Sequence, residues 1–383
     1  MIPSVRRLAG RLDRAWLRAR RSPAAFPRLA AEALTEARLH ESFGLDAFLE
    51  TMWAARTLPE QLSRDERFGQ PPLTLVRKPG FLIDLYFWRS PSTSLHSHGF
   101  RGAFTILQGL SLQADYRFVS SGSPPAPVRT GDLALKGVRL LAPGCVEPIT
   151  TDLAHRVWHL SMPTLSLVAR TTRREAQTTY WEPGLALRYG NEGILDAKRL
   201  GILRTLHWTG LLEDRALVSL LQRLSPRDAL WTLQRYRTDT MDLARLERVL
   251  PDLPKLKPWR RVFLDAMRRM QAAPDLSRTE NDPERLLLAL LLSGVARKDL
   301  LRFLPAGEVM STLKALLTRS ALPFRLNATA LEVLEGRVHG KAYAEIAGDL
   351  ALRYRVSPAR ARTDVRACAA GLGRIGLLGS CLA

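Results

Sequence analysis

The sequence is poor in cysteine and in long apolar runs, and each shortage excludes a class of protein. Three cysteines (Cys145, Cys368 and Cys381), odd in number and widely spaced, fit neither a disulfide framework nor a structural zinc site. The longest apolar run, Leu286–Leu292, is far shorter than the ~20 residues of a membrane helix. No apolar segment follows the basic N-terminus, as a secretory signal would require. We therefore expect a cytoplasmic protein with reduced thiols and no transmembrane segment.

Lysine is also scarce, although the chain is strongly basic. Only eight of the 57 basic residues are lysines, and the net charge is +20. A surplus of this size suits a polyanion partner, but an arginine bias together with many Ala and Leu also follows from a GC-rich coding sequence. The C-terminal stretch 319–383 is not clearly richer in positive charge than the whole chain, so nucleic acid is disfavoured as a partner.

The densest basic segment is at the N-terminus, where seven arginines accompany the single acid Asp13. Two interpretations are open: a basic arm for a membrane surface or nucleic acid, or the solvated face of a helix that packs on the rest of the protein. The arginines concerned are Arg6, Arg7, Arg11, Arg14, Arg18, Arg20 and Arg21.

Hydrophobic patterning divides the chain into four parts. Residues 1–65 predict helices, 66–190 short strands, 191–310 helices again, and 311–383 a last helical unit. β-branched and aromatic residues, separated by Gly, Pro and Ser, are typical of an antiparallel barrel or sandwich. The expected fold class is therefore α+β and multidomain, with the strands at 73–77, 81–88, 104–107, 110–119, 139–141 and 165–169.

Four of the seven histidines, His96, His98, His155 and His159, lie in the β-rich segment. His96 and His98 are alternate residues, so on a strand both rings point the same way. His155, from a neighbouring strand, would complete a group of three imidazoles, which suits iron, zinc, copper or nickel. The sequence predicts a metal site at His96, His98 and His155. The alternative is a degenerate barrel whose histidines only pack.

The run Trp88–Gly99, followed by Gly131-Asp132, Pro143-Gly144 and His155, resembles the metal-binding cupins. Within them it looks most like the cysteine-dioxygenase branch of the thiol dioxygenases, and the resemblance covers about residues 66–172. It implies a jelly-roll barrel that holds iron(II), with zinc, copper, nickel and manganese as alternatives. It also admits a homodimer, because cupins often dimerise.

Departures from the cupin pattern change the expected ligand set. Common cupins carry a glutamate ligand four or five residues after the second histidine, where this chain has Gly102 and Ala103. Three neutral imidazoles would leave the iron positive and ready for an anionic thiolate and O2. Thiol dioxygenases also carry a Ser-x-His-x-Tyr element, and the matching stretch Ser166–Arg170 lacks both His and Tyr. His159 is expected to replace the missing histidine as a hydrogen-bonding group, or else to be a satisfied histidine at a strand end.

Substrate contacts are expected from arginine, which binds carboxylates through two parallel hydrogen bonds. Arg67, Arg77 and Arg101 lie near the relevant segments, and Arg67 and Arg101 join His159 as candidate catalytic-site residues. In so arginine-rich a chain the alternative for each is a surface position. Cys145 precedes His155 closely enough to approach the site, or is a small buried hydrophobe.

The C-terminal unit predicts three short helices. The first ends at Gly336, and Ser357 caps the last, which begins at Pro358. The unit resembles the PqqD-like domains, or RiPP recognition elements, in its run from Arg325 to Gly336, the helix around Ile346, Asp364-Val365 and Gly376-Leu377-Leu378. Those domains are winged-helix folds that hold the leader of a precursor peptide. That family places strands before this point, whereas residues 309–318 read as helical here and leave a short strand at Pro323–Leu326.

Together these features predict a metal-dependent cupin oxygenase that resembles thiol dioxygenases. Its substrate would be a precursor peptide held by the C-terminal module, or another thiol or carboxylate compound. The alternative is a non-catalytic peptide-binding or DNA-binding regulator built on a degenerate cupin. Steep salt dependence of binding would favour DNA in that case.

Overall fold

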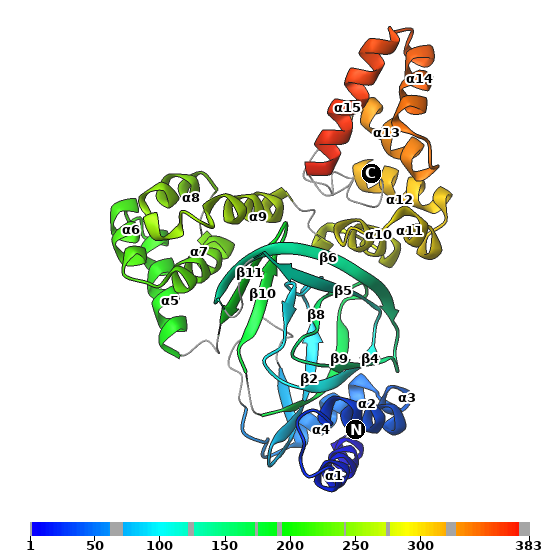
Figure 1. Ribbon diagram of the computed structural model, residues 1–383. Coiled ribbons are helices and arrows are strands. Elements are labelled where there is room, and N and C mark those ends of the chain that lie inside the picture. Colours follow the sequence, from blue (N-terminus) through cyan, green and yellow to red (C-terminus); the bar gives the residue numbers. More distant parts are fainter. Residues whose placement is uncertain are drawn as a thin grey trace.

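The computed structural model describes residues 2–61, 72–121, 126–172, 175–189, 194–240, 243–272, 276–318 and 327–374. A central β region is flanked by three groups of helices (Figure 1). The N-terminal helices lie below it in this view, α5–α9 to its left and α10–α15 above it on the right. The predicted α+β, multidomain architecture is confirmed.

The β region consists of two antiparallel sheets. One has the strand order β1 (Leu73–Lys78), β2 (Phe81–Trp88), β9 (Thr164–Thr171), β4 (Gly102–Gln108) and β7 (Val146–Ile149). The other closes into a barrel, in the order β10 (Gln177–Trp181), β11 (Leu185–Tyr189), β6 (Val128–Leu141), β5 (Ser111–Ser120), β8 (Ala154–His159) and β3 (His96–Ser97). The predicted antiparallel barrel is therefore present.

Several strands differ from the sequence prediction in length or were not predicted. The strand expected at 139–141 is the end of the much longer β6. β10 and β11 form an antiparallel hairpin in a segment where the sequence pattern predicted no particular strand. β3 and β7 are short, so neither offers enough alternating residues for a periodic signal.

Strand β9 shows how the two faces of the first sheet are used. All of its residues are buried, so the strand is covered on both sides. Leu165, Leu167 and Ala169 belong to the core shared with the N-terminal helices. Ser166 and Arg170 point the opposite way, toward the second sheet, because side chains alternate along a strand. The inner face therefore carries polar groups in a buried setting.

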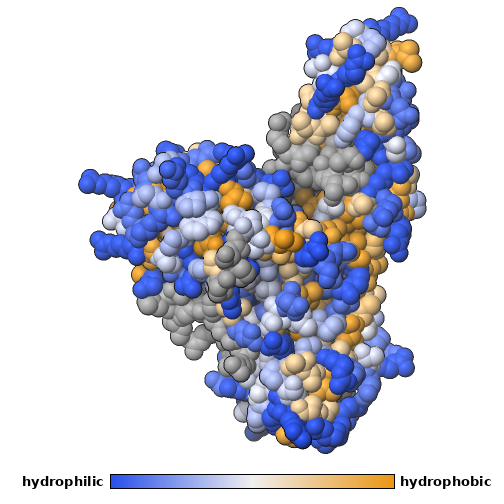
Figure 2. Space-filling model, viewed as in Figure 1, coloured by the Kyte–Doolittle hydropathy of each residue, from blue (hydrophilic) through white to orange (hydrophobic). Residues whose placement is uncertain are grey.

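The N-terminal helices cover the outer face of this sheet. They are α1 (Ile2–Arg18), α2 (Phe26–Ala37), α3 (Leu39–Ser42) and α4 (Leu45–Ala54). In α1, Leu8 and Leu12 are buried, and Trp16 meets Phe26 and Phe81 edge-on at centroid distances of 4.7 and 6.1 Å. The arginine-rich segment is thus a packing helix with a solvated face. In the coloured parts of Figure 2, hydrophilic side chains lie on all three groups of helices, with hydrophobic areas between them.

The remaining helices form two groups with separate cores. The first group, which packs on β10 and β11, comprises α5 (Ile194–Trp208), α6 (Asp214–Gln222), α7 (Pro226–Thr240), α8 (Leu243–Val249), the 3-10 turns Leu250–Asp252 and Pro254–Leu256, and α9 (Arg260–Ala272). The second comprises the turn Leu276–Arg278, α10 (Asp282–Leu292), α11 (Arg297–Phe303), α12 (Ala306–Thr318), α13 (Ala328–Val338), α14 (Tyr343–Tyr354) and α15 (Pro358–Arg374). The predicted domain boundary at residue 310 falls inside α12.

Strand β8 connects the barrel with this second group. Trp158 Nε1 donates a 2.9 Å hydrogen bond to Ser293 Oγ, and Trp158 belongs to the same hydrophobic core as α10 to α15. The C-terminal helices are therefore held against the strand that carries His155. Among the described helices, none combines the length and the apolar character needed to cross a membrane.

The three predicted C-terminal helices are present, but one landmark has a different role. α13 continues to Val338, so Gly336 lies within the helix and does not end it. A Cβ atom at Gly336 would lie 2.6 Å from Ile346 Cγ1, so this glycine permits close packing of α13 on α14. Ser357 Oγ accepts from Arg360 N, which confirms the predicted cap of α15. The expected strand at Pro323–Leu326 lies outside the described residues, so the winged helix stays a prediction.

Candidate metal centre

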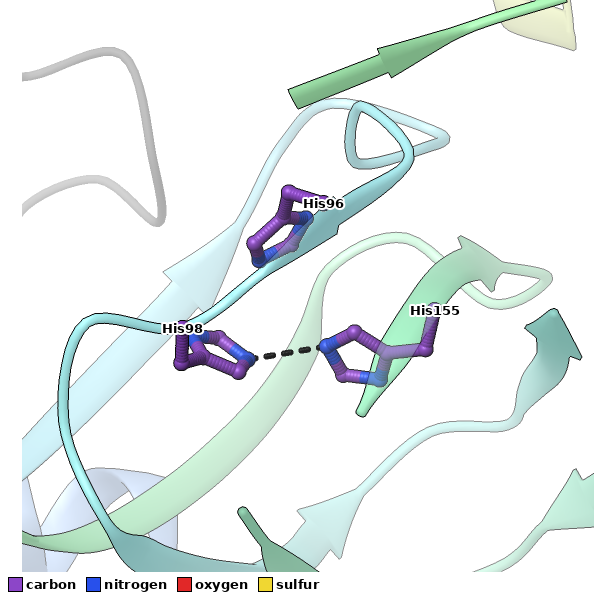
Figure 3. A group of neighbouring side chains, drawn as sticks. All are labelled: His96, His98 and His155. Atoms are coloured by element: carbon purple, nitrogen blue, oxygen red, sulfur yellow. Dashed lines mark hydrogen bonds between the residues drawn. The ribbon is translucent and has the colours of Figure 1, made fainter. Parts of the chain in front are cut away.

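The three predicted metal ligands meet at one point between the sheets. His96 on β3 and His155 on β8 are directly paired across the two strands. β3 ends at Ser97, so His98 lies just beyond it, and its ring still turns toward the other two (Figure 3). The prediction that His96, His98 and His155 converge is thus confirmed, although the local structure is a two-residue strand and not an extended one.

The ring nitrogens of the three histidines are close enough to share one ion. His98 Nε2 lies 2.8 Å from His155 Nε2, and one ring nitrogen from each histidine lies within 4.8 Å of the others. His96 Nδ1 lies 2.7 Å from the Ser94 carbonyl oxygen. Because a carbonyl only accepts, Nδ1 carries the proton and Nε2 keeps its lone pair for a ligand.

Burial keeps these rings neutral. It lowers the pKa of His96, and it holds the pKa of His98 and His155 well below the ordinary value for histidine. The mutual repulsion of the rings and the nearby arginines act in the same direction. Metal ligation requires the neutral imidazole. Hence the environment favours the form that binds a metal.

The donor set and its surroundings fit a divalent transition metal. Neutral imidazoles suit iron, zinc, copper and nickel. No glutamate completes the set within the part of the chain that the structure describes. Gly102, one of the two positions expected for that ligand, lies against β9. A Cβ atom there would be 2.2 Å from the Ala169 carbonyl oxygen. The neighbouring strand therefore excludes a side chain at this position.

Beside the histidines lies a buried ion pair that sequence reasoning did not single out as functional. Arg170 Nε donates to Asp84 Oδ2 at 2.8 Å, and Thr74 Oγ1 donates to Asp84 Oδ1 at 2.8 Å. The Arg170 guanidinium lies over the Phe100 ring at 5.3 Å, and that ring lies 4.6 Å from the ring of His98. The sequence offered one signal for this ion pair, namely Asp84 within the apolar run 81–88, because a carboxylate buried among apolar residues needs a partner.

A second polar group lies next to His155 in the sheet. Asp115 on β5 is paired with His155 and accepts hydrogen bonds from Gln113 Nε2 and from Arg139 Nη2, both at 2.8 Å. Arg139 also pairs with Glu147 at 2.9 Å. Burial raises the pKa of Glu147 despite the attraction of Arg139. The inner faces of both sheets thus hold charged groups around the three histidines.

His159 is buried, and its partners are not the three clustered histidines. Its ring stacks on Trp88 with centroids 4.6 Å apart, and Nδ1 shares a 3.1 Å hydrogen bond with Ser111 Oγ. Trp88 Nε1 in turn donates to Ser166 Oγ at 2.8 Å. Burial lowers the pKa of His159 to about 3, so the ring is neutral near pH 7. The ring lies at a strand end, as the second expectation has it, but Nε2 makes no hydrogen bond to the described residues, so the histidine is not fully satisfied and its role stays a prediction.

The arginines chosen from the sequence are engaged elsewhere or lie outside the described residues. Arg101 bonds to Glu175 Oε1 at 2.5 Å and to Thr151 Oγ1 at 3.3 Å. Arg77 forms an exposed ion pair with Glu60. Arg67 falls in the segment 62–71, outside the described residues. Cys145 is a free thiol, partly buried against the apolar cluster of Phe104 and its neighbours.

Comparisons with known proteins show only distant resemblance. No family model and no curated protein matches the chain. Among solved structures, hydroquinone 1,2-dioxygenase from Sphingomonas sp. TTNP3 is 14% identical, with a TM-score of 0.21, and covers 30% of this chain and 83% of its own. A cupin-superfamily sugar phosphate isomerase from Silicibacter pomeroyi is 15% identical, at a TM-score of 0.20, over 28% of this chain and 68% of its own.

An uncharacterised double-stranded β-helix protein from Klebsiella pneumoniae is 12% identical, with a TM-score of 0.21, over 35% of this chain and 98% of its own. Similarities of this size support no functional inference. The interpretation of the site therefore depends on its own residues and their geometry.

Proposed function

We propose that the protein is a metal-dependent enzyme in which His96, His98 and His155 hold a divalent ion, and that it is an oxygenase of the thiol-dioxygenase type. The convergence of three neutral ring nitrogens between two sheets carries this proposal. His155 comes from β8, whereas His96 comes from β3, and the two strands are neighbours only in the folded barrel. The group of three histidines therefore forms only when the barrel folds.

Iron(II) is the metal we propose, and when bound it would supply the binding of O2 and of an anionic substrate group. The residues of the chain do the rest. Burial holds the three rings neutral, and the Ser94 carbonyl fixes the proton of His96 on Nδ1. The ring of Phe100 packs against the ring of His98 at a centroid distance of 4.6 Å. Because no carboxylate completes the set of three, the substrate would supply the negative charge.

Oxygen uptake tests this activity. The iron-loaded protein would be supplied with thiol compounds and candidate cysteine-containing peptides, with O2 measured by electrode and products by mass spectrometry. We expect thiol-dependent O2 consumption that adds two oxygen atoms to sulfur and is lost in His155→Ala. The control His207→Gln removes a histidine that bonds to Arg245 in the helical region, and it should keep the activity. Thiol oxidation that is equal in wild type and His155→Ala would contradict the proposal.

The substrate is proposed to be peptide-borne or otherwise bulky, with the C-terminal helices as the part that holds it. The three-helix order α13–α15, capped at Ser357, supports this. If the substrate is a precursor peptide, we expect a short open reading frame that encodes a Cys-rich peptide next to the gene of this protein. The chain would be truncated after α12 and its affinity for the encoded peptide compared with that of the full chain. Equal affinities would argue against a role of α13–α15 in holding the peptide.

A further inference from the structure

Arg170 has a buried hydrogen-bond donor without a protein partner. Its side chain is only 3% exposed. Nε is engaged by Asp84, and the guanidinium also interacts with the Tyr86 hydroxyl. Nη1 is buried and makes no hydrogen bond. Leaving a donor of a charged group unsatisfied inside a protein is costly, so this atom is suited to an acceptor that arrives from outside.

The unpartnered atom belongs to the region of the candidate metal centre. Arg170 lies on the inner face of β9, and its guanidinium carbon is 5.3 Å from the centroid of the Phe100 ring. The same ring lies 4.6 Å from the ring of His98, measured between centroids. A single aromatic side chain therefore connects Arg170 with one of the three clustered histidines.

The guanidinium is held in a fixed orientation. One carboxylate oxygen of Asp84 accepts a hydrogen bond from Arg170 Nε and the other accepts one from Thr74 Oγ1, so both oxygens of the carboxylate are fixed. Asp84 also offsets the charge of Arg170, which makes the pair stable in the interior. With the charges of this pair balanced, a divalent ion held by neutral imidazoles would leave the region positive. The unpartnered donor of Arg170 and the positive charge of such an ion both favour an anion as the ligand.

We propose that Arg170 is the residue that recognises a carboxylate of the substrate, through Nη1, beside the three-histidine site. A planar guanidinium matches the geometry of a carboxylate. The proposal rests on the proposed function for the placement of the reacting group, but binding of the carboxylate itself requires only Arg170. Arg101 and Arg77, the arginines singled out from the sequence, already pair with Glu175 and Glu60.

Binding of propanoate and of its neutral isostere propanamide tests the proposal. Affinities would be measured by ligand-observed NMR on the metal-free and the metal-loaded full chain. We expect propanoate to bind the wild type at least tenfold more tightly than propanamide. Arg170→Lys should lose about tenfold of the propanoate affinity, because a compact ammonium that pairs with Asp84 cannot also place a donor at the position of Nη1.

The control is Arg285→Lys, which changes another buried arginine whose donors are engaged by Leu160 O, Thr279 O and Asp282. It should bind propanoate as the wild type does. If Arg170→Lys does not fold, the pair Asp84→Asn/Arg170→Gln removes both charges and keeps a hydrogen-bonded couple. Equal affinity for propanoate and propanamide, or unchanged propanoate affinity in the folded Arg170 variant, would overturn the proposal.

The two proposals fail in distinguishable ways. If the chain binds no metal but propanoate still depends on Arg170 in the metal-free protein, the carboxylate site stands and the proposed enzyme does not. If metal binds to the histidines but the Arg170 variant binds propanoate unchanged, the metal centre stands and this carboxylate site is refuted.

Discussion

Replacement of His159 by phenylalanine should reduce the loss in free energy of unfolding that occurs as the pH is lowered. His159 is 1% exposed, and burial lowers its pKa from 6.5 to about 3. Below pH 6.5 the unfolded chain takes up a proton that the folded ring refuses, so the free energy of unfolding falls as the pH falls. The difference in pKa corresponds to about 5 kcal/mol when the pH has reached 3.

Between pH 6 and pH 4 this ring alone should cost the wild type about 2.5 kcal/mol of stability. His159→Phe retains an aromatic ring against Trp88 and has no such titration, so its loss over the same range should be smaller by that amount. Urea denaturation at a series of pH values, followed by tryptophan fluorescence, measures the difference between the two proteins. Other buried histidines contribute equally to both and cancel.

Ser111→Ala is the matched control. It removes the 3.1 Å hydrogen bond to His159 Nδ1 but keeps the titrating ring. This variant should be less stable by about 1 kcal/mol at neutral pH and should keep the steep acid dependence of the wild type. If His159→Phe and the wild type lose stability in parallel from pH 6 to pH 4, the assignment of His159 as a neutral buried histidine is refuted.

Two further substitutions test the packing around the site. Trp158→Phe removes the hydrogen bond to Ser293 and should destabilise the chain by about 1 kcal/mol in urea denaturation; a variant as stable as the wild type would show that this bond contributes nothing. Gly336→Ala would bring a Cβ atom to 2.6 Å from Ile346 Cγ1 and should destabilise the C-terminal helices, since overpacking costs about 1–3 kcal/mol against about 1 kcal/mol of gained helix propensity. A rise in the melting temperature measured by circular dichroism would contradict the close packing of α13 on α14.

The barrel and the three ligands could be predicted because their signals are local. Alternating apolar segments between Gly and Pro indicate strands, and His96 and His98 are only two positions apart, although just one of them lies on β3. That His155 would meet them required one long-range assumption, that its strand is a neighbour of β3, and the pairing of His96 with His155 confirms it.

Arg170 shows what such local signals leave out. Its place on an apolar strand was visible in the sequence, but its function depends on Asp84, 86 positions away, and on Phe100. Nothing in the pattern of one strand says which polar residue finds a partner and which is left with an unpaired donor. The role of Gly336 was misread for the same reason, because a glycine near a helix end looks the same whether it ends the helix or admits a neighbouring side chain.

The central claim is that His96, His98 and His155 form a metal site, and the metal content of the purified chain tests it most directly. Protein loaded with iron(II) without oxygen, desalted and measured by elemental analysis should hold about one ion per chain. The His96→Ala/His155→Ala variant, folded by circular dichroism, should hold almost none. Equal metal content in the two proteins would contradict the account.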